Sequence, residues 1–212
     1  MTEKLVLASG NAGKLKEFQA LLARAHFEVL AQSEFFATEA EENGLSFVEN
    51  AIIKARYAAD RSGFPALADD SGLEVDYLRG TPGIYSGRFA GENASDEDNN
   101  RKLLDQLQDI PEQQRSARFQ CVLVYMRHAQ DPSPLICQGT WEGMILSEPR
   151  GINGFGYDPL FFAPDQNCTS AQLPADTKNV VSHRGQAMKQ LLAAFASGGV
   201  NKHTQGNTIR HA

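Results

Sequence analysis

The stretch Leu5-Val6-Leu7-Ala8-Ser9-Gly10-Asn11-Ala12-Gly13-Lys14 decides the class of fold. An apolar run typical of a strand is followed by a glycine-containing turn and then by a helical pattern. Free backbone N–H groups at such a turn, together with the dipole of the helix that follows, favour an anion, so the stretch predicts a phosphate site. Lys14 adds a positive charge and Asn11 an amide donor. A plain structural connector is the alternative that these residues alone leave open.

This turn differs from a Walker P-loop, in which a glycine and four further residues precede Gly-Lys-Ser/Thr. Ala8 stands at the first glycine position, and Leu15 follows the lysine. Because Leu15 has no hydroxyl group to hold magnesium, a metal ion must be held elsewhere in the chain.

The hydrophobic pattern outward from this turn predicts alternating strands and helices. Strands are expected over 4–8, 27–30, 65–68, 117–128 and 135–146, and helices over 12–25, 47–62, 96–107 and 183–196. Ser46 followed by Glu49 forms a capping box, which explains Glu49 as part of a helix start. Early alternation followed by two adjacent long strands predicts an α/β domain with a mixed sheet. We expect one domain over 1–197 and a disordered polar tail over 198–212.

Composition limits the classes of function. The chain has 212 residues, a hydrophobic content of 42% and a charged content of 22%, which are typical of an ordinary globular protein. Its net charge of −6 argues against a general nucleic-acid binder. No apolar stretch approaches the ~20 residues of a membrane span. Cys121, Cys137 and Cys168 show no metal-ligand spacing, and Thr2-Glu3-Lys4 leads directly into a strand pattern. We therefore expect reduced cysteines, a cytoplasmic location, and neither nucleic acid nor membrane as a partner.

An acidic pair, Asp69-Asp70, follows the predicted strand 65–68, so we expect it at a strand end, where open α/β sheets place their sites. Adjacent carboxylates repel each other unless a cation compensates them, and Mg²⁺ is a hard ion that prefers carboxylate and phosphate oxygens. Asp-Asp-Ser-Gly is also good turn chemistry, so a polar turn is the alternative. Glu42, within the acidic stretch 39–42, offers one further metal ligand.

A second glycine-rich loop, 151–158, presents two flat rings, Phe155 and Tyr157, which predict either a stacking site for a base or core packing. Asp158 adds an acceptor for a base edge. Lys178 and the run Ser182-His183-Arg184 offer donors, although capping of the last helix by Ser182 explains that serine equally well. The absence of Gly-x-Ser-x-Gly argues against a covalent serine hydrolase.

Taken together, the motifs resemble the inosine triphosphate pyrophosphatase family. The matching pieces, in the order of the family and spanning about residues 4–197, are 9–14 with Glu17, Glu42 with 44–51, 68–73, 82–86, 154–159 and 182–185. The resemblance implies a long mixed central sheet flanked by helices in two lobes, with the active-site cleft between them. It also implies a homodimer.

The resemblance further implies Mg²⁺-dependent hydrolysis of deaminated purine nucleoside triphosphates (dITP/ITP and dXTP/XTP) to the monophosphate and pyrophosphate, which sanitises the nucleotide pool. A pyrophosphatase for modified pyrimidine nucleotides and a nucleotide-binding sensor without turnover are the alternatives. In the implied roles, Asp70 accepts the proton of the attacking water and Lys14 neutralises the leaving group. The implied metal ligands are Glu42, Asp69 and Asp70. The implied substrate-binding residues are Ser9, Gly10, Asn11, Ala12, Gly13, Lys14, Ser71, Phe155, Gly156, Tyr157, Asp158, Lys178, His183 and Arg184.

Overall fold

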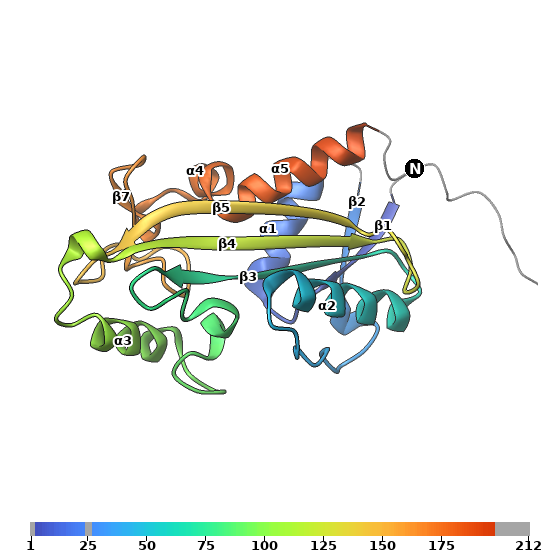
Figure 1. Ribbon diagram of the computed structural model, residues 1–212. Helices are drawn as coiled ribbons and strands as arrows, with labels where there is room; N and C mark the ends of the chain where they lie inside the picture. Colours follow the sequence, from blue (N-terminus) through green and yellow to red (C-terminus); the bar gives the residue numbers. More distant parts are fainter. Residues whose placement is uncertain (1–2, 24–26, 198–212) are drawn as a thin grey trace, which may run out of the picture.

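The computed structural model describes residues 3–23 and 27–197, and it is built around one seven-stranded sheet (Figure 1). The strands lie in the order β2-β1-β3-β4-β5-β6-β7. Their bounds are β1 Glu3–Ala8, β2 Phe27–Ala31, β3 Ala66–Val75, β4 Ser116–Met126, β5 Leu135–Ile145, β6 Phe161–Ala163 and β7 Cys168–Thr169. The pairs β2–β1 and β1–β3 are parallel and the remaining pairs are antiparallel, which confirms the predicted mixed sheet.

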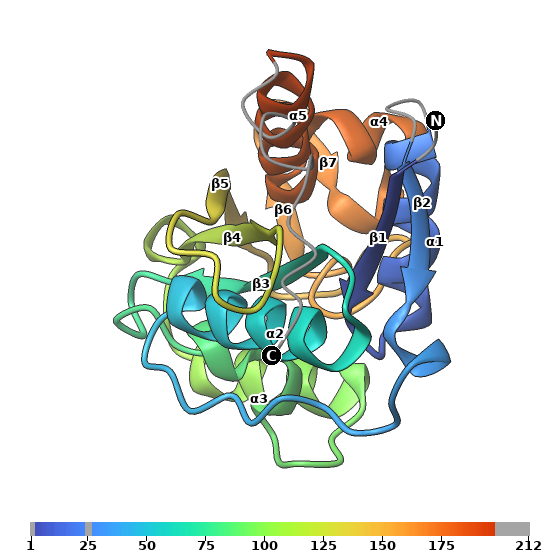
Figure 2. The ribbon, with the colours of Figure 1, turned by 90° about the vertical axis from the view of Figure 1, so that its right-hand side faces the viewer.

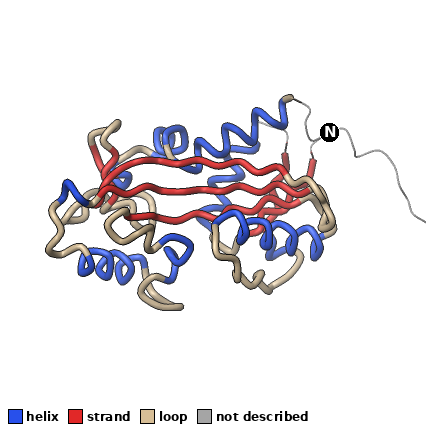
Figure 3. Tube along the Cα trace, viewed as in Figure 1, coloured by secondary structure: helices blue, strands red, loops and turns tan. Residues whose placement is uncertain are grey.

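Helices cover both faces of this sheet. Their bounds are α1 Ala12–Leu22, α2 Phe47–Ser62, α3 Asp96–Gln106, α4 Ala175–Val181 and α5 His183–Ala196, with a 3₁₀ segment η3 at Gly83–Arg88. Figure 1 shows α2 and α3 on one side of the long strands and α4 and α5 on the other, and Figure 3 shows the strands as one continuous band between them. The turned view of Figure 2 shows α1 beside β1 and β2.

The apolar core is divided between the two faces and the two ends of the sheet. One cluster joins Phe18 of α1 and Leu191 of α5 to Leu67 and Leu123 of the sheet. A second packs the alanine stripe of α2 against the opposite face. A third, at the far end of β3–β5, includes Leu103 of α3. Burial of these large side chains contributes on the order of 25 cal/mol per Å² of apolar surface and fixes each helix on its strand.

Both predicted caps are confirmed. The Ser46 side chain accepts from the Glu49 N–H at the start of α2, and the Glu49 carboxylate accepts from Leu45 N at 3.0 Å. Ser182 accepts from Gly185 N at 3.2 Å and begins α5.

The prediction that a strand ends at Asp69 is wrong. β3 continues through the acidic pair, because Asp69 pairs with Leu123 and Asp70 with Val122 in the ladder with β4. The turn propensity of Asp-Asp-Ser-Gly is therefore overridden by ten residues of pairing with a long neighbouring strand.

Other boundaries also differ from expectation. The first helix ends at Leu22, and residues 24–25 of its expected range lie outside the described residues, as does the predicted tail 198–212. Helix α4 and strands β6 and β7 were not predicted, since all three are too short to give a clear period. None of the described helices is long and apolar enough to cross a membrane.

Candidate active site

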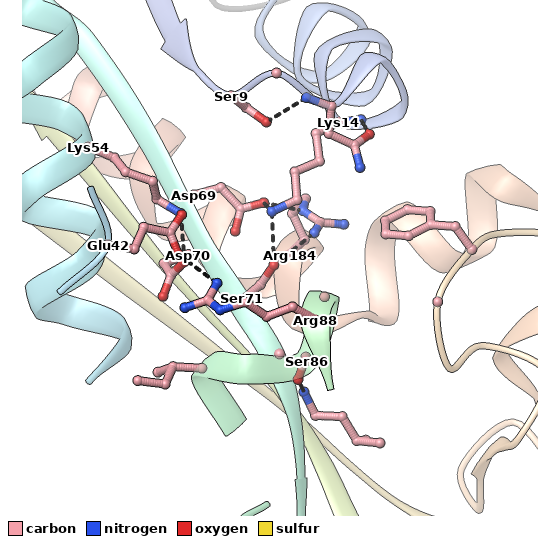
Figure 4. Close-up of a pocket in the computed structure, with 18 of the residues that line it drawn as sticks. Ser9, Lys14, Glu42, Lys54, Asp69, Asp70, Ser71, Ser86, Arg88 and Arg184 are labelled. Atoms are coloured by element: carbon pink, nitrogen blue, oxygen red, sulfur yellow. Dashed lines mark hydrogen bonds and ion pairs between the residues drawn. The ribbon is translucent and has the colours of Figure 1, made fainter. Parts of the chain in front are cut away.

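Residues far apart in the sequence meet around one cavity of about 460 Å³. Its wall is contributed by the β1–α1 turn, the middle of β3, α2, η3, the start of α3, the loop 155–158 and the start of α5. Figure 4 shows the labelled side chains of this cavity converging on the strand that carries Asp69, Asp70 and Ser71. Most of the predicted site residues line the cavity: Ser9, Gly10, Asn11, Lys14, Glu42, Asp69, Asp70, Ser71, Phe155, Gly156, Tyr157, Asp158, Lys178, His183 and Arg184.

The turn after β1 places the capped start of α1 at the cavity. Asn11 is the N-cap of α1, and its Oδ1 accepts from Gly13 N at 2.8 Å and from Lys14 N at 3.0 Å. Ser9 Oγ accepts from Asn11 N at 3.2 Å. The positive end of the helix is therefore aimed at the cavity, with Lys14 reaching across to β3.

Asp69 and Asp70 point to opposite faces of β3, as successive residues of a strand must. Asp69 is 1% exposed and lies 2.9 Å from Arg184 Nε and 3.2 Å from Lys14 Nζ. Burial alone would raise the pKa of Asp69, but Arg184 and Lys14 outweigh it and hold that pKa well below its usual range. Asp69 is therefore an ionised anchor for two cations.

Arg184 extends this network to the helix on the same face. Its Nη1 donates to Glu17 Oε2 at 3.0 Å and its Nη2 to Ser71 Oγ at 3.2 Å. Ser71 Oγ also accepts from Lys14 Nζ at 3.3 Å. Glu17 carried no role from sequence, although its place one turn after Lys14 puts both on the same face of α1.

On the other face, Asp70 is paired with a lysine that the sequence reasoning missed. Lys54 Nζ of α2 lies 2.6 Å from Asp70 Oδ1 and 3.2 Å from Glu42 Oε1. Burial raises the pKa of Asp70, against the opposing charge of Lys54. Burial lowers the pKa of Lys54, but Asp70 and Glu42 outweigh it and raise that pKa. The signal for Lys54 was present, because it follows the buried Asn50 by four residues on the inner row of α2.

Arg88 completes this side of the cavity and was also missed. Its Nη1 lies 3.8 Å from Glu42 Oε2, and its guanidinium lies 5.3 Å from the centre of the Tyr85 ring. Arg88 lies in the segment 79–96, where the hydrophobic pattern predicts neither a helix nor a strand before residue 96. The sequence alone therefore does not place its side chain.

The three predicted metal ligands, Glu42, Asp69 and Asp70, do not all face the same part of the cavity. Asp69 faces Arg184 and Lys14, and no group of three acidic, histidine or cysteine ligands occurs among the residues that the structure describes. Glu42 and Asp70, in contrast, share Lys54 and face the same side of the cavity. Asp70 Oδ2 is buried and has no hydrogen-bond partner among the described residues. A carboxylate pair with one unused buried oxygen fits Mg²⁺ when substrate phosphates and water supply the remaining ligands.

At the other end of the cavity, a buried ion pair holds the aromatic loop. Asp158 pairs with Lys178 Nζ, accepts from Ser170 Oγ at 2.7 Å and accepts from Phe155 N at 2.9 Å. The Phe155 ring is 42% exposed, with Lys178 Nζ 5.2 Å and the Arg184 guanidinium 5.8 Å from its centre. Phe155 is thus a ring backed by cations and open to the cavity.

His183 and Tyr157, both predicted to bind substrate, lie in different surroundings. His183 is stacked on Phe119 at 4.8 Å, and burial lowers its pKa well below the usual value, with Arg184 adding to the effect. Its Nδ1 is buried without a hydrogen-bond partner among the described residues, so a neutral imidazole stands at the cavity with one nitrogen unused. Tyr157 is instead part of the core, and its hydroxyl donates to Ser86 O at 2.9 Å.

The close packing of α5 on β5 brings His183 and Arg184 to this position. A Cβ on Gly139 of β5 would lie 2.0 Å from the His183 carbonyl oxygen, so only glycine permits this approach. The sequence marked Gly139 as an ordinary strand position, and its role becomes visible only once the helix is placed.

Comparison with known proteins identifies the family of this chain. Residues 5–194 match the Ham1 family. A dITP/XTP pyrophosphatase of Vibrio cholerae is 60% identical over 193 residues, covering 91% of this chain and 96% of its own. One of Escherichia coli O157:H7 is 56% identical over 196 residues, covering 92% of this chain and 100% of its own.

Solved structures show the same fold. A HAM1 protein from Coxiella burnetii superposes with a TM-score of 0.86 at 49% identity, covering 92% of this chain and 99% of its own. The Ham1 protein of Staphylococcus aureus gives 0.82 at 41% identity, with 93% and 100% covered. These likenesses confirm the resemblance to the inosine triphosphate pyrophosphatases and the predicted fold, and the chain belongs to the Ham1 family.

Proposed function

We propose that this chain hydrolyses deaminated purine nucleoside triphosphates, dITP and XTP with their ITP and dXTP counterparts, to the monophosphate and pyrophosphate. The observation that carries the proposal is that one cavity joins an anion-binding turn, a carboxylate with an unused buried oxygen and an aromatic pocket rich in donors. The names of the relatives from Vibrio cholerae and Escherichia coli support the same reaction.

The triphosphate binds in the cavity beside the middle of β3, between groups that come from α1 and groups that come from α2 and η3. The Lys14 ammonium and the positive end of α1 meet it from one side, while Lys54 and Arg88 meet it from the side of α2 and η3. Lys14 neutralises charge that develops on the leaving pyrophosphate. Ser71, which both Lys14 and Arg184 contact, adds a hydroxyl group beside them. Phosphoryl transfer of this kind depends on positioning and charge neutralisation more than on covalent help.

Asp70 accepts the proton of the water that attacks the α-phosphorus. Its Oδ1 is held by Lys54 at 2.6 Å, while its Oδ2, which has no hydrogen-bond partner in the part of the chain that the structure describes, faces the water molecule. Lys54 thereby fixes the carboxylate in one orientation. Glu42 and Asp70 would hold Mg²⁺, which supplies charge neutralisation at the phosphate oxygens.

The base lies against Phe155. Hypoxanthine and xanthine carry an oxygen acceptor at position 6 and an N1–H donor, whereas adenine presents the reverse pattern. Lys178, His183 and Arg184 supply donors for the oxygen, and a site that loses these bonds with adenine discriminates by ~10⁴ or more. Because both oxygens of Asp158 are already bonded, its contribution is to hold Lys178 in place.

We further infer that residues 1–197 act as one functional domain, that the protein works as a homodimer, and that it acts in the cytoplasm. The resemblance to the inosine triphosphate pyrophosphatases supports these three inferences. Light scattering coupled to size-exclusion chromatography tests the dimer directly.

Pyrophosphate release from dITP, XTP, GTP and ATP, each with and without Mg²⁺, tests the proposed reaction. We expect rapid Mg²⁺-dependent release from dITP and XTP and little from GTP and ATP. Equal rates on all four substrates would contradict the base pocket but retain the phosphate site. Binding of dITP without release of pyrophosphate would instead identify a nucleotide sensor.

A further inference from the structure

The first turn of α3 is bonded to the loop that carries Phe155, and the reaction proposed above does not use these bonds. Asp96 Oδ2 accepts from Gly156 N at 2.6 Å, and Asn100 Nδ2 donates to Gly156 O at 2.8 Å. Both backbone polar groups of the residue after Phe155 are therefore held by one helix. We call the side chains of Asp96 and Asn100 the α3 clasp.

The clasp joins segments far apart in the sequence, next to a partly exposed ring. Asp96 and Gly156 are 60 residues apart, and the Phe155 ring beside them is 42% exposed. Lys178 Nζ and the Arg184 guanidinium lie 5.2 Å and 5.8 Å from its centre, on the side that they back. Because part of Phe155 is exposed, the position of its ring also depends on how firmly its backbone is held.

The clasp is itself held at its base. Ser95 caps α3, since its Oγ accepts from Asp98 N at 3.1 Å, and Asn100 Nδ2 also donates to Asp96 O at 2.9 Å. On the far side of Gly156, the Tyr157 hydroxyl donates to Ser86 O at 2.9 Å. The segment is thus anchored on both sides, and Asp96 lines the cavity next to it.

We propose that Asp96 and Asn100 are positioning residues for the purine: through Gly156 they fix the Phe155 ring at the mouth of the cavity before the substrate binds. This inference rests on the proposed placement of the base against Phe155. A stacking surface that is already ordered loses no conformational freedom on binding, so the clasp increases affinity for the nucleotide.

The expected kinetic signature is a rise in KM at constant kcat. Stacking on Phe155 is present in the ground state and in the transition state alike, and loss of such uniform binding affects KM alone. Asp96→Ala removes one hydrogen bond to the loop, and we expect it to raise the KM for dITP about three- to tenfold.

Two matched variants separate the clasp from a general effect on the helix. Glu97→Ala removes a neighbouring carboxylate from the same first turn, with a similar loss of interaction with the helix dipole, but Glu97 makes no hydrogen bond to the loop in the described structure. We expect its KM to equal that of the parent. Asp96→Asn keeps an acceptor oxygen facing Gly156 N, and we expect it to restore most of the affinity.

A double-mutant cycle with Phe155→Ala tests the route of the effect, with inorganic tripolyphosphate as a competitor that has no base. We expect Asp96→Ala to change KM less than about twofold in the Phe155→Ala background, and to leave tripolyphosphate inhibition unchanged. If Asp96→Ala raised KM equally in both backgrounds, or weakened inhibition by tripolyphosphate, the clasp would not act through Phe155 and its proposed positioning role would be wrong. If Phe155→Ala alone leaves KM unchanged, the proposed base site fails, and the clasp fails with it.

Discussion

Replacing each of the two adjacent aspartates of β3 by asparagine separates turnover from stability. Asp70→Asn keeps the shape of the side chain but removes the proton acceptor, and general-base catalysis of this kind contributes ~10²–10⁴ in rate. The fold tolerates the change, because Lys54 retains Glu42 at 3.2 Å and no buried cation is left without a partner. We therefore expect kcat to fall at least ~10²-fold with little change in the free energy of unfolding.

Asp69→Asn perturbs the opposite face. It leaves Arg184 and Lys14 facing a neutral amide in a site where the aspartate is 1% exposed. Breaking a buried pair in this way costs ~3–5 kcal/mol, and Glu17, which stays 3.0 Å from Arg184, brings the expected cost to the lower end. For a chain of this size, about 3 kcal/mol lowers Tm by roughly 6–12 °C.

Two assays on the same preparations separate the effect of each substitution on turnover from its effect on stability. Pyrophosphate release from dITP gives kcat, and urea unfolding followed by circular dichroism gives the free energy of unfolding. If Asp70→Asn retained more than a tenth of the parent kcat, Asp70 would not be the proton acceptor. If Asp70→Asn destabilised the fold as much as Asp69→Asn, the two carboxylates would not have the separate roles assigned to the two faces of β3.

Three further outcomes are expected. Gly72→Ala places a Cβ 2.3 Å from the Gly83 carbonyl oxygen and should cost ~1–3 kcal/mol of stability, measured by urea unfolding, whereas Gly87→Ala meets no described atom within 4 Å and should cost less. Glu42→Gln should raise the Mg²⁺ concentration needed for half-maximal turnover, seen by titration of the metal into chelator-treated enzyme; an unchanged requirement would remove Glu42 as a ligand. Hydrogen bonds from Arg127 hold the pKa of Asp131 well below its usual value. The ionised carboxylate therefore stabilises the folded state above the unfolded-state pKa of ~3.9, and this stabilisation is lost as the pH falls through the lower folded-state pKa. The difference in Tm between the parent and Asp131→Asn should therefore be full at pH 7 and shrink below about pH 4, and a difference that grows on acidification would contradict this cause.

The phosphate turn could be predicted from sequence because its chemistry is local. Strand, turn, cap and lysine lie within ten residues, so the pattern at 5–14 contains nearly all of the geometry. The helix starts at Ser46 and Ser182 were predictable for the same reason.

The partners of the acidic pair could not be predicted, because they depend on which face of β3 each residue occupies. Local propensity favours a turn at Asp-Asp-Ser-Gly, and only pairing with β4 keeps the segment extended. That pairing sends Asp69 to Arg184, 115 residues away, and Asp70 to Lys54 on a helix of the other layer. The links from Asp96 and Asn100 to Gly156 are equally distant, and no short-range pattern marks them.

The opposite orientations of Asp69 and Asp70 also constrain how the gene can change. Side chains in a strand alternate between its two faces, so a single residue inserted between Ala68 and Asp69 would move each carboxylate of the acidic pair to the opposite face. The acceptor carboxylate would then lie on the face of Arg184, and the anchoring one on the face of Lys54. Descendants of this gene can therefore vary the composition of β3 (Ala66–Val75) more readily than the spacing between Ala66–Ala68 and the acidic pair.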